Sequence, residues 1–493
     1  MLAAALAAGL AAGAEGPARA GEPEGRWMAG DFHIHTLLTD GGRRPDEVAL
    51  HAAAFGLDWF AFSEHGGNYS RDQDGKPFPA KIPRWITLKY FSFPIVRRLR
   101  EEYPEKRIVH GVEWNVPAHE HASVGIVSDD PAAVSDFEYA CDAADGDASR
   151  DLRKRNRTHE DAVACVAMLA GRYPGRSYFI PNHPSREGRY AIADLRDFHN
   201  AAPDAAFGFE GIPGHQKARG RGGYYHSPAD PADAFRFRTH GGADYMAAKV
   251  GGAWDALLGE GRRFFLFANS DFHDTWGGFW PGEYAKSYTF VTGDDLAAVI
   301  GGMRSGNSFA VLGGLIDALS FTARANGDTA TMGEALTVSR GDRVEIAVAF
   351  RTPPVNNNGE APRVDHVDLI AGSVAGKAEP GTAGYRIDVH PDARVVARVS
   401  PREWSCEDGR CEARIDAGPV DGDMFFRLRG TNLPTGTPGE TDADGNPLPD
   451  DMACGEGQTP ARCNTAQKAY ADLWFYSNPI FVEVLPRTIF TRP

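Results

Sequence analysis

The chain lacks several features that mark common protein classes. Beyond its first 20 residues it has no run of about 18 apolar residues, so a membrane-spanning helix is not expected. The 52 lysines and arginines are outnumbered by 67 aspartates and glutamates, and the net charge of −15 argues against nucleic acid or an anionic membrane as a partner held by bulk charge. The cysteines form no C-x-x-C, which disfavours a cysteine-bound zinc, and no G-x-S-x-G supplies a serine nucleophile.

What remains is the composition of an ordinary soluble protein. With 493 residues, 42% of them hydrophobic and 24% charged, the chain is long enough for two or three domains. Residues 2–14 contain only alanine, leucine and glycine, and Ala18-Arg19-Ala20 offers a cleavage site, so residues 1–20 are predicted to be a signal peptide. This segment lacks a basic start, and the alternative is an alanine-rich tail.

The six cysteines support export to the periplasm or the medium. An even number in an exported chain favours disulfides, and we expect local pairs. These pairs are Cys141–Cys165, Cys406–Cys411 and Cys454–Cys463. Six free thiols are the alternative.

Residues 26–315 alternate between short apolar strands and helical stretches. A helix is expected over Pro45–Phe55, where proline occupies a plausible first turn, and another over Thr158–Leu169, where Thr158 and Asp161 form a loose capping box. The expected strands are Trp27–His33, Trp59–Ser63, Arg107–Glu113, Ala122–Val127, Tyr178–Ile180, Phe207–Glu210, Phe264–Ala268 and Ser287–Val291. Seven or eight such units favour an α/β barrel.

Other stretches depart from this alternation. Gly66–Arg100 and Gly211–Tyr245 read as long loops at the mouth of the barrel, the alternative being insertions that only pack. Residues 316–493 show strand-like segments between glycine, proline, asparagine and aspartate clusters, so a small all-β sandwich is predicted there.

Histidines and carboxylates recur where the expected strands end. His33 and His35 stand two residues apart after an apolar strand, and such a pair points to one face. Asp271 and His273 repeat this spacing. The full set of candidate metal ligands is His33, His35, Asp40, His65, Glu113, His121, His183, Asp271 and His273. Because the catalytic residues of α/β barrels gather at the carboxyl ends of the strands, we expect all nine at one mouth.

These motifs resemble the polymerase and histidinol phosphatase (PHP) superfamily of metal-dependent phosphoesterases. The matching pieces are H33-I-H35 with D40, E64-H65, E113, H121-A-S-V-G, H183-P184 and D271-F-H273. The resemblance covers about residues 27–310 and implies a distorted (β/α)7 barrel resembling a TIM barrel. SGNSFAVLGGLIDALSF, Met332-Gly333 and YSNPIFVEV further resemble the CehA-like branch, in which a C-terminal β-domain is frequent.

The resemblance also implies two or three divalent metals. His33, His35, Glu113 and Asp271 would hold the first, and Glu113 would bridge to a second. His121 and His183 would complete the second, and Asp40, His65 and His273 a third. The nitrogen and oxygen donors suit Zn, Mn or Fe without choosing among them. Glu64 stands where the family pattern has aspartate, which puts the partner of His65 in doubt.

Two further residues are candidates for catalysis. Arg186 follows His183 by three residues and is expected to grip a phosphate, and His215 would protonate a leaving group. Lys286 is a further phosphate candidate. His119 is expected outside the ligand set, and the remaining histidines, His159 among them, have no motif context.

The expected activity is hydrolysis of small organic phosphate monoesters or diesters by a metal-bridging hydroxide. One alternative is a carboxyl or carbamate ester hydrolase of the CehA type, and another is a non-catalytic surface-binding protein with structural metals. The sequence decides neither the substrate, the metal nor the oligomeric state.

Overall fold

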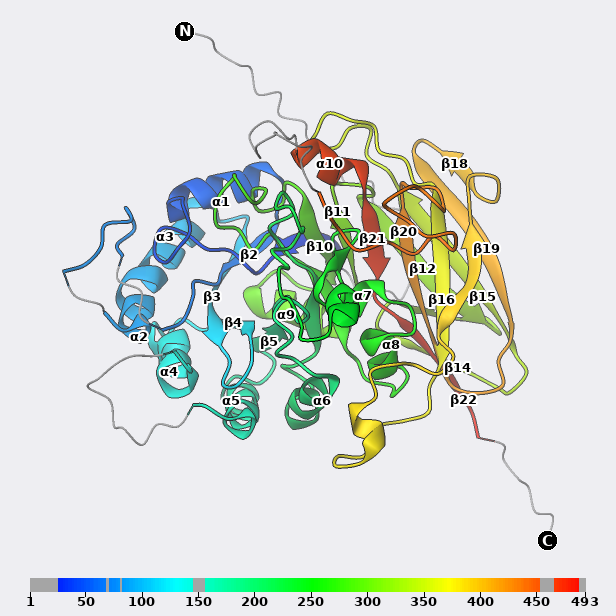
Figure 1. Ribbon diagram of the computed structural model, residues 1–493, viewed down its shortest axis with the longest axis horizontal. Helices are drawn as coiled ribbons and strands as arrows, with labels where there is room; N and C mark the ends of the chain where they lie inside the picture. The colour runs from blue at the N-terminus through cyan, green and yellow to red at the C-terminus, as the bar shows by residue number, and fades with distance from the viewer. Residues whose placement is uncertain (1–24, 68–70, 80–81, 145–155, 453–464, 487–493) are drawn as a thin grey trace.

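The computed structural model describes residues 25–67, 71–79, 82–144, 156–452 and 465–486. The predicted signal peptide and the predicted pair Cys454–Cys463 lie outside these residues. The fold is a mixed α/β structure with a large central sheet (Figure 1). Among the described residues, no helix combines the length and the hydropathy needed to cross a bilayer.

Seven strands of the N-terminal part are arranged in a ring. They are β1 (Arg26–Asp31), β2 (Trp59–Phe62), β3 (Arg107–Asn115), β4 (His121–Ile126), β5 (Ser177–Pro181), β6 (Gly208–Ile212) and β9 (Phe265–Ala268). Strands β1, β2 and β3 are parallel neighbours, β6 pairs with β9 in parallel, and β6 lies next to β5. A parallel bridge between Ile34 and Phe272 joins the chain after β9 to the chain after β1.

Strand β4 runs antiparallel to both β3 and β5. The ring is therefore barrel-like, and the reversed β4 interrupts the repeat of parallel strand–helix units on which the predicted distorted (β/α)7 barrel is based. The reversal places the first residue of β4, His121, at the edge where β3 ends, because Asn115 pairs with His121. Another strand, β10 (Ala285–Val291), pairs antiparallel with β1.

Six helices lie on the left and lower side of Figure 1: α1 (Pro45–Ala54), α2 (Arg84–Thr87), α3 (Phe93–Glu102), α4 (Ala132–Cys141), α5 (His159–Arg172) and α6 (Ile192–Ala201). Three more, α7 (Tyr245–Ala248), α8 (Ala253–Leu258) and α9 (Leu296–Ser305), lie nearer the middle of the view. The predicted capping box is present on α5: the Thr158 hydroxyl accepts from the Asp161 amide, and the Asp161 carboxylate accepts from the Thr158 amide.

The expectation of a long loop over Gly66–Arg100 is wrong for its second half. A π-helical turn, η1 (Leu88–Ser92), joins α2 to α3, so residues 84–102 are continuously helical. Phe93, Val96 and Leu99 recur every three residues and bury one face of α3, and Pro94 stands where the π-helical turn passes into α3. The many prolines and aromatic residues of Gly66–Arg100 obscured this helical spacing of apolar residues in the sequence.

The C-terminal part consists mainly of two sheets, seen on the right of Figure 1. One sheet has the order β13 (Asp328–Thr331), β12 (Ala318–Ala325), β15 (Arg343–Arg351), β19 (Arg410–Pro419) and β18 (Ser405–Glu407). The other contains β14 (Ala335–Val338), β16 (His366–Ser373), β17 (Arg394–Val399), β20 (Met424–Thr431), β21 (Trp474–Ser477) and β22 (Ile480–Val484). One helix, α10 (Thr465–Ala471), also belongs to this part.

The second sheet continues into the N-terminal part. Strand β21 pairs with β11 (Ser308–Leu312), and β11 pairs with β10, which in turn pairs with β1. One apolar core spans both parts, with Phe309 and Leu266 on one side and Phe475 and Phe426 on the other. The two predicted domains are thus built on one shared sheet and one shared core.

Two of the predicted local disulfides are confirmed. Cys141 at the end of α4 bonds to Cys165 in α5, and Cys406 bonds to Cys411 across the hairpin of β18 and β19. Both bonds join neighbouring elements.

A buried ion pair also ties the two parts together. The guanidinium of Arg427 in β20 donates from Nε and Nη2 to the two carboxylate oxygens of Asp255 in α8, at 2.6 and 2.8 Å. Neither side chain is exposed, and the Arg427 guanidinium lies 4.7 Å from the ring of Trp254. The two charges satisfy each other where water cannot.

Substituting Arg427→Met should lower the free energy of unfolding by about 3–5 kcal/mol, because it leaves the Asp255 carboxylate buried without a cation. Urea unfolding measures this change. The matched control is Arg343→Met, which removes the surface pair with Asp416, whose side chains are 65% and 59% exposed, and should leave the free energy of unfolding almost unchanged. Equal losses of unfolding free energy in the two variants would contradict the assignment of the Arg427–Asp255 ion pair as a buried link between the two parts.

Candidate metal centre

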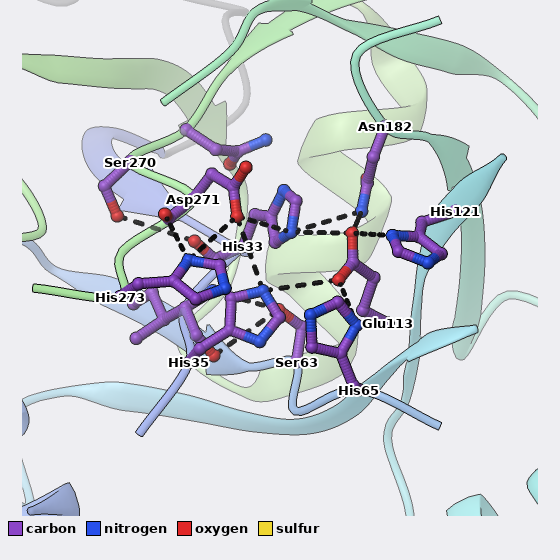
Figure 2. Close-up of polar contacts among 12 residues, drawn as sticks. His33, His35, Ser63, His65, Glu113, His121, Asn182, Ser270, Asp271 and His273 are labelled. Carbon is purple, nitrogen blue, oxygen red and sulfur yellow. Dashed lines mark hydrogen bonds and ion pairs between the residues drawn. The ribbon is translucent and has the colours of Figure 1, made fainter. Parts of the chain in front are cut away.

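The nine predicted ligands come together at one end of the ring. Figure 2 shows seven of them pointing toward a common centre from strands and loops that are far apart in the sequence. His33 and His35 follow β1, His65 follows β2, Glu113 lies near the end of β3, and Asp271 and His273 follow β9. All contact at least one other member of the set.

Glu113 lies at the centre of this arrangement. Its carboxylate is 1% exposed, and its two oxygens lie 2.8–3.6 Å from the nearest ring nitrogen of each of five imidazoles, those of His33, His35, His65, His121 and His183. Burial opposes its ionisation, but the imidazoles of His121, His33 and His65 hold the pKa of Glu113 well below its usual range. The group is therefore an anion placed to bridge several cations.

Asp271 forms a second anionic point beside Glu113. Its Oδ1 lies 3.2 Å from Nε2 of His33 and 3.4 Å from Nε2 of His35. Its Oδ2 accepts from Nη2 of Arg186 at 2.7 Å and lies 3.1 Å from Nε2 of His215. Despite burial, His33, His215 and Arg186 hold the pKa of Asp271 well below its usual value.

Asp40 organises a third group on the more exposed side. Its Oδ2 lies 3.2 Å from Nε2 of His65 and 3.3 Å from Nε2 of His273. The ring of His35 stacks on those of His65 and His273, with centroids 4.5 and 4.2 Å apart. Asp40 is 32% exposed, whereas Glu113 and Asp271 are buried, so solvent reaches this group most easily.

Several nitrogen and oxygen atoms of the cluster that could bind a metal are buried and have no hydrogen-bond partner among the described residues. These are both ring nitrogens of His35, both ring nitrogens of His183 and Oδ1 of Asp40. Burial, with the nearby His273 and His65, lowers the pKa of His35 to about 3, and burial with Arg186 lowers that of His183 well below its usual value. Neutral imidazoles with free lone pairs beside carboxylates are the donor set that divalent transition metals bind, so the residues fit such ions.

The ligands form overlapping groups of close donor atoms. Mutually close sets include His35, Asp40, His65 and His273; His33, His183 and Asp271; His33, His35 and Glu113; and His65, Glu113 and His121. The residues expected to hold a third metal are thus found together, joined by His35. The two histidines expected on the second metal, His121 and His183, both face Oε1 of Glu113, at 3.3 and 3.6 Å.

Sequence reasoning missed the residues that orient these ligands. Glu210 in β6 is fully buried; its Oε1 lies 3.0 Å from Nδ1 of His33, and its Oε2 accepts from the His183 amide at 2.9 Å. Asn182 donates from Nδ2 to Glu113 at 2.8 Å. A carboxylate inside the apolar strand Gly208–Ile212 was the available signal for Glu210, the same signal that singled out Glu113.

Glu64 contacts the turn between His35 and Asp40. Its carboxylate accepts from the Thr36 amide at 3.2 Å and from the hydroxyls of Thr36 and Thr39. It therefore fixes the turn that leads to Asp40.

Arg186 and His215 reach the centre, and Lys286 does not. Ser185, beside Arg186, donates from its amide and its hydroxyl to the buried Asp244, which fixes the loop after His183. Lys286 instead donates from Nζ to the carbonyl of Phe55 at the end of α1, 3.1 Å away. The expectation that Lys286 contacts a phosphate is wrong, because β10 directs its side chain toward α1.

Three residues of the centre have left-handed backbones. The φ angles are 32° at His183, 52° at His215 and 42° at Asp271, a region that costs energy for residues other than glycine. Such strain persists where surrounding contacts impose it, and functional sites are where it gathers.

Comparison with known proteins gives a weak alignment to a solved structure. No family model and no curated protein matches the chain. A crystal structure from Bacteroides vulgatus, of a two-domain protein containing a predicted PHP-like metal-dependent phosphoesterase, aligns over 88% of this chain and 98% of that chain, with 13% identity and a TM-score of 0.36. At that identity and TM-score the match says nothing about chemistry, so the site residues themselves carry the functional conclusion.

The purified protein should contain divalent metal ions. His33→Ala or Asp271→Ala should reduce the number of ions bound at the centre to near zero, because both side chains contact the buried core of the cluster. Asp40→Asn should remove about one ion and leave the others, since Asp40 belongs only to the more exposed group. Elemental analysis of each variant measures this difference. His51→Gln, which changes a histidine stacked on Trp280 away from the cluster, is the control. Full metal content in His33→Ala would refute the assignment.

Proposed function

We propose that the chain is a metal-dependent hydrolase of small organic phosphate esters, related to the PHP superfamily. The observation that carries the proposal is the contact between Arg186 and Asp271, which sets a guanidinium against a ligand of the candidate metal centre. A phosphate ester presents several anionic oxygens, and an adjoining cation beside metal ions matches that charge distribution.

The nine-residue cluster would hold the ions, with Glu113 and Asp271 as its shared anions. Bound divalent metals would lower the pKa of water and offset the negative charge that builds on the phosphoryl oxygens. Asn182 and Glu210 would keep the carboxylate of Glu113 and the ring of His33 in place.

Arg186 is built to stay charged and to receive an anion. Burial opposes its charge, but Asp271 and Tyr224 raise the pKa of the guanidinium above its usual value. One nitrogen, Nη2, is used by Asp271, whereas Nε is buried without a hydrogen-bond partner among the described residues. A phosphate oxygen is the acceptor that would satisfy Nε while the ester contacts the metals.

Small residues keep the space beside Arg186 and His215 open. A Cβ at Gly223 would lie 3.7 Å from His215 and 3.9 Å from Arg186, and one at Gly277 would lie 4.0 Å from His215. These glycines bring two loops close to both side chains without covering them. His215 is 24% exposed, which leaves its ring accessible to a leaving group.

Arg186→Ala should lower kcat/KM for 4-nitrophenyl phosphate and bis(4-nitrophenyl) phosphate on the order of 10²- to 10³-fold, because a charge-stabilising donor is lost. The rates with 4-nitrophenyl acetate and a 4-nitrophenyl carbamate should change little, since those esters carry no anionic oxygens. Steady-state assays of the metal-loaded enzyme measure both. The control is Arg172→Ala on the outer face of α5, whose side chain is 48% exposed. Turnover confined to acetates or carbamates would favour the CehA-type alternative instead.

His215→Gln should separate substrates by their leaving groups. An alkyl phosphate needs a proton on the departing oxygen, so its rate should fall about 10²-fold or more. 4-Nitrophenolate leaves without a proton, and its rate should fall less than about 10-fold. Parallel rates on the two esters measure the split; equal losses would assign His215 to positioning rather than to proton transfer.

We also propose that the protein is exported. The disulfides Cys141–Cys165 and Cys406–Cys411 support this, because such bonds persist in oxidising compartments. N-terminal sequencing of protein recovered from periplasm or medium would show whether cleavage follows Ala20.

A further inference from the structure

A second cluster of histidine and carboxylate lies outside the metal centre. It consists of His119 in the turn before β4, His159 at the start of α5, and Asp194 and Asp197 in the first turns of α6. One donor atom from each of His119, His159 and Asp194 lies within 4.8 Å of the others. None of these four residues belongs to the nine-residue metal centre.

The hydrogen bonds of the two imidazoles determine which nitrogen of each carries the proton. Nδ1 of His119 lies 2.8 Å from the carbonyl of Arg189, and that oxygen can only accept, so Nδ1 carries the hydrogen. Nε2 of His159 lies 3.1 Å from a carboxylate oxygen of Asp197, so Nε2 carries the hydrogen there. The remaining nitrogens, Nε2 of His119 and Nδ1 of His159, are therefore both lone-pair acceptors in the neutral rings.

These two nitrogens lie 2.9 Å apart, within hydrogen-bond distance. Because both are acceptors in the neutral rings, either a proton or a metal cation must lie beside them. Asp194 supplies an anion at the same place, with Oδ1 3.7 Å from Nδ1 of His159. We propose that His119, His159 and Asp194 bind a divalent metal ion of the zinc class, separate from the metal centre and independent of the proposed hydrolysis.

The separations suit a small metal ion. With metal–ligand bonds of about 2.05 Å, the 2.9 Å and 3.7 Å separations correspond to angles of roughly 90° and roughly 130° at the ion, on either side of the tetrahedral value. Two histidines and a carboxylate are a frequent zinc donor set, and a water molecule would complete four ligands.

The surroundings of the cluster resemble those of a built metal site. Each histidine donates its other N–H to an oxygen, which is how ligating histidines are oriented. Asp197 is itself held, because the Tyr385 hydroxyl donates to its Oδ1 at 2.6 Å. The ring of His119 stacks on Tyr190, with centroids 5.1 Å apart, and its side chain is 6% exposed.

The ion would fasten three elements beside the active centre. His119 precedes the ligand His121 by two residues, and the Tyr190 hydroxyl donates to the carbonyls of Glu120 and His121. An ion on His119 would thus anchor the turn that presents His121 to the helices α5 and α6. The role is structural, since these residues lie outside the set around Glu113.

The test counts metal ions in protein stripped with a chelator and then equilibrated with micromolar buffered Zn²⁺. His159→Gln should contain about one ion per chain less than the wild type and should keep the ions of the main centre. Asp197→Asn retains all three ligands but weakens the orientation of His159, so it should bind that ion about 10- to 100-fold more weakly. Because Asp197→Asn leaves the ligands intact, it keeps the test informative if His159→Gln folds poorly.

His226→Gln, which changes a histidine packed on Phe237, is the matched control and should keep the wild-type count. The thermal midpoint of the wild type should rise with Zn²⁺ by more than that of His159→Gln. Equal ion counts in the wild type and His159→Gln would overturn the proposal in favour of a proton shared by the two rings. Loss of every ion in His159→Gln, or an ion that binds only at millimolar Zn²⁺, would overturn it as well.

Discussion

The structure depends on burying the carboxylate of Glu113. A lone anion in that position would cost several kcal/mol, so a chain that places one there must surround it with groups of opposite charge. Five imidazoles surround it from three strand ends and one strand start, and those of His121, His33 and His65 favour its ionised form. The same residues pack the ring and form the candidate ligand set, so metal binding would be coupled to folding.

The residues around this cluster make its two sides different. Asp271 faces the histidines with one oxygen and Arg186 and His215 with the other. The left-handed backbones at His183, His215 and Asp271 are stabilised by neighbouring contacts such as that of Glu210 with the His183 amide. Charge is thus arranged asymmetrically, with the candidate metal ligands on one side of Asp271 and the guanidinium of Arg186 on the other.

Local patterns predicted much of this, and long-range geometry explains the rest. The strands that precede His33, His65 and Asp271 could be predicted from their apolar runs. The capping box at Thr158 could be predicted from the spacing of Thr158 and Asp161. The direction of β4 could not be predicted, because an apolar strand looks the same whichever way it runs. The pairing of His119 with His159 spans 40 residues and leaves no local signal, since it arises only when α5 packs beside the turn before β4.

The continuous pairing of β1, β10, β11 and β21 has a consequence for how such a chain can evolve. A domain joined by a linker can be gained, lost or exchanged by recombination without harm to its neighbour. Here the edge of β11 is covered by β21, so loss of the C-terminal part would expose unpaired backbone groups and the apolar face around Phe309. The two parts are therefore expected to be inherited and to diverge together as one unit of selection.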